Sequence, residues 1–254
     1  MKNNEVHAQF YSNLYKDQKN TDLIMKVSKE PLKDVIKWYD YAREVLNCKI
    51  KSLFFRLHSS SSEHRQTIDW IAAQNKTMKF TSVLNEIEEL DDDLKYFMET
   101  IQILEGFYLM VNKHKDDFRI EIPGKPKCLH IGNAQFIDYN QLLRLKSPVI
   151  VLQKSILTNE EINRFLRSWM SCETHLDLEA LQINILGPNA MNEIMDLPHE
   201  KTNALNLVQA FYDYHMIRQV INEMFTLKRC NGKKRATVTT GRSGDDWTLY
   251  LVVH

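Results

Sequence analysis

Apolar residues recur along most of the chain in two alternating periods, one typical of a strand and one typical of a helix. Leu53, Phe55 and Leu57 alternate with other residues, which predicts a strand, and residues 61–74 then carry apolar side chains at helical spacing. The same alternation continues along the chain. A strand starting near 78–80 is followed by a helix around 94–101 and by strands at 107–111, 118–122 and 128–131. A helix at 137–145, a strand at 149–153, a helix around 162–169 and a strand at 178–183 come next. This pattern predicts an α/β fold.

The helices also carry start signals. Ser60 stands three residues before Glu63, and Thr158 stands three residues before Glu161, which is the capping-box spacing. Upstream, short strands are expected at 6–10 and 22–27, and Pro31 begins an amphipathic helix that extends to residue 46.

The predicted strands between Leu53 and Leu178 follow one another at about 20 to 29 residues, which is within the range of leucine-rich repeats. Parallel strands joined by helices can stack so that each unit buries one face against its neighbours. We therefore expect a leucine-rich-repeat-like solenoid of alternating strands and helices, although the literal leucine-rich consensus is absent.

The rhythm changes after Gly187 and Pro188. A helix at 205–223 is followed by two β-prone runs around Asn231 and Gly232, a pair that takes the positive φ angles of a tight hairpin, and then by a strand at 247–252. We expect these strands to form an antiparallel β-hairpin cap on the stack. The predicted parts are residues 1–47 (N-terminal strands and amphipathic helix), 48–185 (repeat stack) and 186–254 (helix and β cap).

Composition excludes several classes of protein. The 33 basic and 33 acidic side chains cancel, so no global field directs the chain to nucleic acid or to an anionic membrane. The four cysteines form no C-x-x-C pair, no signal-peptide core opens the sequence, and no apolar run approaches the ~20 residues that cross a bilayer. These features predict reduced thiols in a cytoplasmic or nuclear protein without membrane contact.

Candidate chemistry is sparse. The nine histidines are scattered without metal-ligand spacing, and no glycine-rich phosphate loop or nucleophile elbow is present, so we expect no metal, no cofactor and no enzymatic activity. Cys172 and His175 are neighbours in sequence, but a nucleophile and its base normally meet through the fold. The carboxylates between Glu86 and Asp93 are interpreted as a solvated helix start rather than as a paired acid site.

One local charge feature stands out at the predicted hairpin. Its members are Lys228, Arg229, Lys233, Lys234, Arg235 and Arg242, called the basic cluster below. Such a cluster could hold phosphate backbones, which gives an alternative function as a nucleic-acid-associated regulator. Strand alternation would place Lys228 and Arg229 on opposite faces, and basic hairpins are more often solvated or contact acidic proteins, so nucleic acid is the less favoured partner.

Residues 147–170, with the pattern strand, Leu-Thr, and a helix containing Phe-Leu-x-x-Trp, followed by the strand at 176–183, resemble the F-box-associated (FTH, type 2) domain of nematode F-box proteins. The stretches 38–53 and 225–238 resemble the same family. The residues that carry the pattern are Leu157, Thr158, Phe165, Leu166, Trp169, Asn231 and Gly232. In that family an F-box binds a Skp-type adaptor of a ubiquitin ligase, and the associated domain is thought to capture the protein to be ubiquitinated.

No F-box is recognisable before the first amphipathic helix, so a Skp-type adaptor is not the expected partner. The resemblance implies a non-enzymatic protein–protein interaction module. It would act in substrate recognition for ubiquitination or as an F-box-less regulator or decoy.

Overall fold

The computed structural model describes residues 30–47, 49–57, 62–86, 91–115, 118–122, 124–203, 205–214, 223–243 and 246–254. By their contacts the residues divide into two units, Met1–Ile50 and Lys51–His254, and each unit is described by itself. The strands expected at 6–10 and 22–27 and the capping role of Ser60 lie outside the described residues.

The first unit contains α1 (Pro31–Leu46), as the helical spacing predicted. Proline suits the first helical turn because the missing N–H would have no intrahelical acceptor there. The helix ends at Leu46, and Asn47 caps it with a left-handed φ of 48°. Trp38 and Tyr41 pack edge to face at 6.4 Å between ring centroids.

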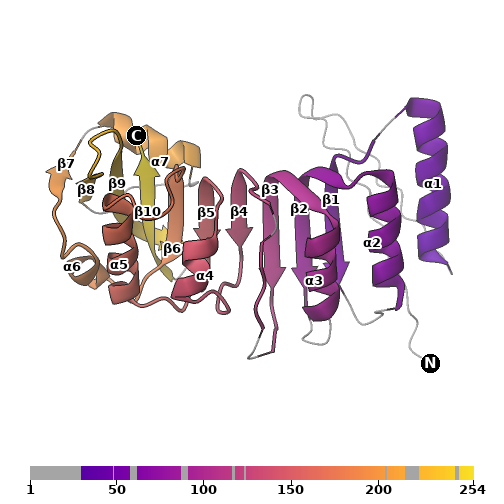
Figure 1. Cartoon of the computed structure of the whole chain (residues 1–254), viewed down its shortest axis with the longest axis horizontal. Helices are drawn as coiled ribbons and strands as arrows, with labels where there is room; N and C mark the ends of the chain where they lie inside the picture. The colour runs from indigo at the N-terminus through magenta and orange to yellow at the C-terminus, as the bar shows by residue number, and fades with distance from the viewer. Residues whose placement is uncertain are drawn as a thin grey trace. The chain divides into compact units, whose positions relative to one another are not determined.

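The second unit is built on one ten-stranded sheet with the order β1-β2-β3-β4-β5-β6-β10-β9-β8-β7 (Figure 1). Strands β1 to β6 pair in parallel in the order in which they occur along the chain, and β10, β9, β8 and β7 continue the sheet in antiparallel pairs. The strands are β1 (Ser52–Leu57), β2 (Thr77–Asn85), β3 (Gln102–Val111), β4 (Cys128–Ile131), β5 (Val149–Leu152), β6 (Ala180–Asn184), β7 (Glu200–Thr202), β8 (Met224–Lys228), β9 (Arg235–Ser243) and β10 (Asp246–Val253).

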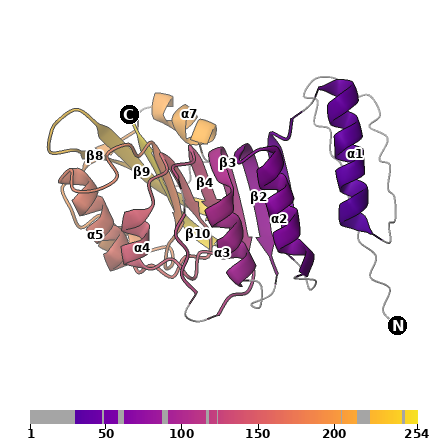
Figure 2. The same cartoon turned by 45° about the vertical axis from the view of Figure 1, so that its right-hand side comes forward.

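Helices between the parallel strands cover one face of this sheet (Figures 1 and 2). They are α2 (Ser62–Gln74), α3 (Asp91–Thr100), α4 (Tyr139–Arg144) and α5 (Asn159–Met170). Alternate residues of each strand point into this layer, for example Phe55 of β1, whose ring stacks on Phe97 of α3 at 5.4 Å. We call this side of the sheet the helix face and the other side the open face.

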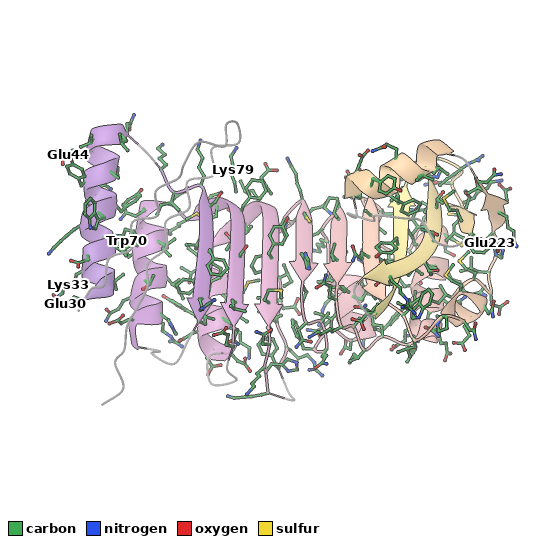
Figure 3. All side chains as sticks on the ribbon, turned by 180° about the vertical axis from the view of Figure 1, so that it is seen from behind. Glu30, Lys33, Glu44, Trp70, Lys79 and Glu223 are labelled. Atoms are coloured by element: carbon green, nitrogen blue, oxygen red, sulfur yellow. The ribbon has the colours of Figure 1, made fainter. Side chains whose placement is uncertain are left out.

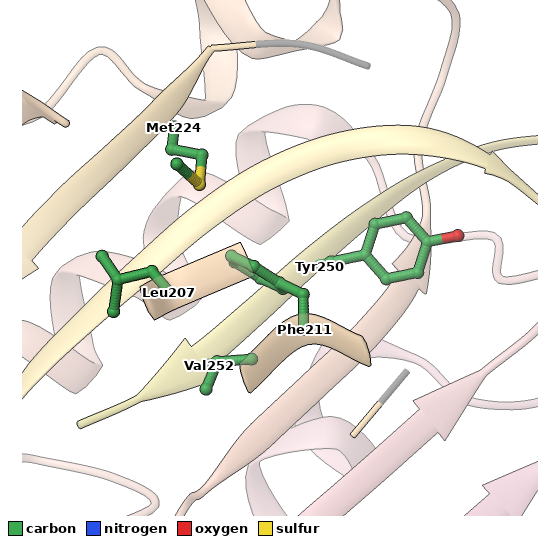
Figure 4. Close-up of a cluster of buried hydrophobic side chains, with 5 residues drawn as sticks. All are labelled: Leu207, Phe211, Met224, Tyr250 and Val252. Atoms are coloured by element: carbon green, nitrogen blue, oxygen red, sulfur yellow. The ribbon is translucent and has the colours of Figure 1, made fainter. Parts of the chain in front are cut away.

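On the open face, α7 (Leu205–Tyr214) covers only the strands near β10. Leu207 and Phe211 of α7 form a buried cluster with Met224, Tyr250 and Val252 (Figure 4). Tyr250 pairs with Gln182 and Val252 pairs with Ala180, so α7 rests on the β10 side of the sheet. A further short helix, α6 (Ala190–Ile194), follows β6.

The structure confirms the predicted α/β class, the helix and strand alternation between residues 52 and 184, and the antiparallel C-terminal strands. The capping box of α5 is also confirmed: Thr158 Oγ1 accepts from the backbone N of Glu161 at 3.2 Å, and the Glu161 carboxylate accepts from the backbone N of Thr158 at 2.9 Å. The predicted helix at 205–223 is described as α7 only to Tyr214, because residues 215–222 lie outside the described range.

Three local expectations were wrong or incomplete. Residues 118–122 form no strand, since Phe118 and Ile120 are buried as packing residues in a loop and not as members of a ladder. The β8–β9 connection is not a two-residue turn: only Gly232, at φ 67°, has a positive φ there, and the connection spans residues 229–234. Neither α6 nor the three-residue β7 was predicted, because both are too short for a period to appear.

Trp169 is the largest fully buried side chain in the part of the chain that the structure describes. We predict that Trp169→Ala lowers the free energy of unfolding by about 3–5 kcal/mol, because it removes a buried aromatic side chain and leaves a cavity. Urea titration followed by circular dichroism measures this. Trp38→Ala, at a tryptophan that is 55% exposed, is the control and should change the value by less than about 0.5 kcal/mol.

Candidate interaction surface

Large apolar side chains lie uncovered on the open face of β1, β2 and β3. They are Phe54, Phe80, Tyr108 and Met110, called the apolar strip below, and their exposed fractions range from 39% to 66%. The register places them on one face, since Phe54 pairs with Ser82, Ser82 with Tyr108, and Leu84 with Met110. Among the described helices of Lys51–His254 none covers these strands on this face, which Figure 3 shows from behind.

Two glycines, Gly106 and Gly132, determine how close the side chains of the apolar strip lie to the backbone. A Cβ atom at Gly106 would lie 2.8 Å from Cδ1 of Phe80 and 3.3 Å from Cε2 of Tyr108. A Cβ atom at Gly132 would lie 1.8 Å from the sulfur of Met110. The two aromatic rings and the thioether therefore lie down over bare backbone, which makes the strip flatter than a sheet with side chains at every position.

Three ionisable groups in or next to the apolar strip, Tyr108, Cys128 and His130, have pKa values shifted towards their neutral forms. Burial raises the pKa of Tyr108 and of the Cys128 thiol, and burial lowers the pKa of His130. The rings of Tyr108 and His130 lie 5.6 Å apart between centroids. These shifts favour the uncharged forms of Tyr108 and of its neighbours on β4.

Cations flank this surface. Arg56 lies on the open face beside Leu84, and Lys51 and Lys79 are exposed at the opposite end of β1 and β2 (Figure 3 labels Lys79). Lys127 Nζ lies 2.8 Å from a carboxylate oxygen of Glu105. Within the described residues, neither Arg56 nor Lys51 has a salt-bridge partner, so the rim of the strip carries uncompensated positive charge.

The predicted basic cluster is divided among different environments. Lys228 pairs with Glu200, and Lys234 Nζ donates to the carbonyl oxygen of Leu176 at 3.1 Å. The guanidinium of Arg242 lies 5.2 Å from the centroid of the Trp247 ring. Lys233 and Arg235 are exposed at the β8–β9 connection and at the start of β9.

Arg229 is a buried structural residue, which the sequence did not indicate. Only 4% of it is exposed. Its guanidinium donates to the backbone carbonyl oxygens of Trp169, Thr174, His175 and Leu176 at 2.9 to 3.2 Å, and lies 4.6 Å from the Trp169 ring centroid. A guanidinium supplies five donors in a fixed plane, so one side chain can hold the whole loop that follows α5.

The acidic start of α3 also differs from its interpretation as a solvated helix start. Asp91 and Asp93 are buried. Asp93 accepts from Nε of Arg65 at 3.0 Å and lies 3.2 Å from Nδ1 of His64, while Asp91 accepts from Asn85 Nδ2 and from the backbone N of Lys115. Burial raises the pKa of Asp91. These carboxylates bind α3 to the adjoining helix, strand and loop.

No contact joins the side chains of Cys172 and His175 within the described residues. His175 packs against Phe165 at 5.0 Å between ring centroids, and Thr174 Oγ1 lies 2.6 Å from its Nδ1. No group of three metal-ligating side chains occurs in the described part of the chain. None of the described helices is both long and apolar enough to span a bilayer.

The apolar strip was missed although a signal for it exists in the sequence. Residues 53–55 and 107–111 are apolar at nearly every position, whereas a strand with one solvated face alternates apolar and polar residues. Strand alternation predicts the core-facing positions alone, so it does not reveal the second apolar face of these strands.

We predict that Arg229→Lys lowers the free energy of unfolding by about 2 kcal/mol or more, because a single ammonium cannot serve the carbonyl oxygens that the guanidinium now binds. Urea titration at neutral pH measures the change. Arg235→Lys, at an exposed position of β9, is the matched control and should remain within about 0.5 kcal/mol. Equal, small effects at both positions would contradict the structural role of Arg229.

His175 predicts a pH dependence of stability. Burial lowers its pKa from 6.5 to about 4, so the unfolded chain binds a proton at a higher pH than the folded chain does. Stability is therefore complete above the unfolded pKa and is lost as the pH falls from about 6.5 to about 4, by up to about 3 kcal/mol. Urea titrations at pH 7 and pH 4.5 should show a smaller loss for His175→Phe, and an unchanged loss would count against this origin.

Comparisons with known proteins agree with the resemblance read from the sequence. No curated protein and no solved structure matches the chain. The family model described as F-box associated matches residues 117–183, the segment that contains β4, α4, β5, α5 and most of β6. Trp169 and the capping box of α5 lie inside this segment. Residues 117–183 of the chain are thus similar to the F-box associated family.

Proposed function

We propose that the chain is a non-enzymatic protein–protein interaction module of F-box-associated type. The match of residues 117–183 supports a role in protein interaction, and the apolar strip offers a surface for it. Exposed contiguous apolar surface is unusual on a protein without a binding partner. The proposed location of the chain is the cytoplasm, the nucleus or both.

The observation that carries this proposal is the apolar strip itself. Phe54, Phe80, Tyr108 and Met110 lie side by side without a covering helix among the described residues of Lys51–His254. Aromatic residues and methionine are enriched at protein interfaces, where they contribute large contact areas at a small entropic loss. Such a surface fits a protein ligand better than a small molecule, because Gly106 and Gly132 leave it flatter than a sheet with side chains at every position.

The charges at the rim indicate the chemistry of the partner. Arg56 and Lys51 have no ion-pair partner among the described residues, and Lys79 is exposed nearby. A partner segment with apolar side chains at its centre and carboxylates on its flanks would bury the strip and neutralise these cations.

We further propose that β1 to β6 and their helices act as a leucine-rich-repeat-like stack. The parallel strands occur in chain order, and the units between them are of similar length. In stacks of this kind each unit contacts its neighbours, and the accumulated surface of the strands binds extended partners.

The link to ubiquitination is a separate part of the proposal. A chain that recognises substrates for a ubiquitin ligase must join a Skp-type adaptor directly or through another protein. A decoy or regulator binds the same partner without the adaptor. Size-exclusion chromatography of the purified chain mixed with a Skp-type adaptor tests direct recruitment, since only a chain that binds the adaptor itself gives a complex that elutes earlier than either protein.

We predict that a random peptide library displayed on phage, selected against the full chain, yields peptides that combine apolar residues with Asp or Glu. Phe54→Glu should weaken binding of such a peptide at least about tenfold, which is about 1.4 kcal/mol, because it places a charge inside the apolar strip. Fluorescence polarisation with a labelled selected peptide measures the dissociation constant.

The matched control is Ile156→Glu, because Ile156 is 55% exposed in the β5–α5 connection, away from the strip. This control should keep the affinity of the unmodified chain. Arg56→Glu should also weaken binding, in proportion to the acidic residues of the peptide. Peptides that bind the Phe54→Glu and unmodified chains equally well would reject the apolar strip as the binding surface.

A further inference from the structure

Two cysteines from distant parts of the chain meet at the surface. The Sγ atoms of Cys172 and Cys230 are 2.8 Å apart although 58 positions separate the residues. This distance is about 0.8 Å longer than the ~2.05 Å of a disulfide bond. Cys172 lies in the loop after α5 and is partly exposed, and Cys230 lies in the β8–β9 connection and is exposed.

The backbone holds both residues in place. The N–H of Cys230 donates to the carbonyl oxygen of Met170 at 2.7 Å, and the N–H of Cys172 donates to that of Trp169 at 3.2 Å. Arg229, adjacent to Cys230, binds the carbonyl oxygens of the same loop. Cys172 has a φ of 62°, in the left-handed region that residues with a side chain rarely adopt. The two sulfur atoms are thus brought together by the fold and not by a flexible approach.

The two thiols have different reactivities. The Cys230 thiol donates to the Cys172 sulfur, and this hydrogen bond is the main cause that lowers the pKa of Cys172; the backbone N–H of Asn231 and the Arg229 guanidinium lower it further. The pKa of Cys230 is raised, first by its hydrogen bond to Cys172. Thiolates are the reactive form of cysteine, so the lowered pKa favours Cys172 as the nucleophile of the pair and Cys230 as the resolving thiol.

We propose that Cys172 and Cys230 are a reversible oxidation site, in which a peroxide converts the thiol pair into a disulfide. This role is independent of the proposed binding function.

Oxidation of the thiol pair takes two steps, in which atoms and electrons balance. The Cys172 thiolate attacks one oxygen of hydrogen peroxide, so that an S–O bond forms, the O–O bond breaks and hydroxide leaves, giving a sulfenic acid at Cys172. The sulfur of Cys230 then attacks the Cys172 sulfur, the S–S bond forms, the S–O bond breaks, and hydroxide leaves. With the two thiol protons these hydroxides become two waters, and the two sulfurs have given two electrons to the peroxide. A dithiol reverses the disulfide by thiol–disulfide exchange.

The disulfide would fasten the same two segments that Arg229 already joins. It would close a loop between residues 172 and 230 that contains β6, α6, β7, α7 and β8. Closing a loop of this length restricts the unfolded chain, so we expect oxidation to raise the midpoint of thermal unfolding by roughly 5 to 10 °C. Cys128 should not take part, because burial raises its pKa.

The test treats the full chain, reduced and then freed of reductant, with a small excess of hydrogen peroxide and maps peptides without reduction by mass spectrometry. A chain with Cys48→Ser and Cys128→Ser is treated in parallel, so that only the proposed pair can react. The expected product is a Cys172–Cys230 cross-linked peptide in both, lost on addition of dithiothreitol, together with the rise in unfolding temperature.

Two further measurements assign the roles. In Cys230→Ser, dimedone should trap a sulfenic acid at Cys172, whereas in Cys172→Ser the label at Cys230 should be much weaker. In the unmodified chain, iodoacetamide at pH 7 should alkylate Cys172 at least about tenfold faster than Cys230, which needs no substitution and so does not depend on how the variants fold. Pairing with another cysteine, overoxidation without a cross-link, or equal alkylation rates would overturn the proposal.

Discussion

The antiparallel pairing of β10 with β6 is the contact on which the rest of the second unit depends. It joins Ala180–Asn184 to Asp246–Val253 and so continues the parallel half of the sheet into the antiparallel half. Asn184 strengthens the joint, because its Nδ2 is within hydrogen-bonding distance of the Trp247 carbonyl oxygen and of Thr248 Oγ1. β9, β8 and β7 attach to the sheet only through β10. Without this pairing, α7 would lose its packing contacts with Tyr250 and Val252. Arg229 would also not reach the carbonyl oxygens of the loop after α5.

The same pairing explains why the two faces of the sheet differ along its length. Parallel sheets are usually covered on both faces, because their crossover helices pack on each side. Here the crossovers between β1 and β6 place their helices on the helix face, and among the described helices of Lys51–His254 only α7 lies on the open face, at the β10 side. The strands β1 to β3 keep apolar residues on both faces, whereas the described helices of Lys51–His254 cover only one face there, and the apolar strip is the result.

Periodicity predicted those parts of the fold that local sequence controls. The strand and helix alternation and the capping box of α5 follow from residues close together in the chain, so Thr158 and Glu161 could be read directly. The order of the sheet could not be read, because the partner of β6 arrives about 65 residues later and no local signal marks it. The environment of Arg229 was missed for the same reason: a guanidinium is normally solvated, and only the fold brings enough carbonyl oxygens around it.

The two candidate sites differ in how far they depend on long-range pairing: the apolar strip lies in the parallel half of the sheet, and the thiol pair involves the antiparallel half. The apolar strip is made of residues on β1 to β3, whose positions follow from neighbouring parallel strands, and Gly106 and Gly132 set its shape locally. The thiol pair forms because the β8–β9 connection lies against the loop after α5, so it depends on strand pairing between distant parts of the chain. The strands β4, β5 and β6 lie between the two sites, and the structure describes a single conformation for them. Energetic coupling between two sites needs an element whose conformation both sites can shift. Oxidation at Cys172 and Cys230 should therefore change the stability of the fold, while the affinity for a partner depends on the apolar strip.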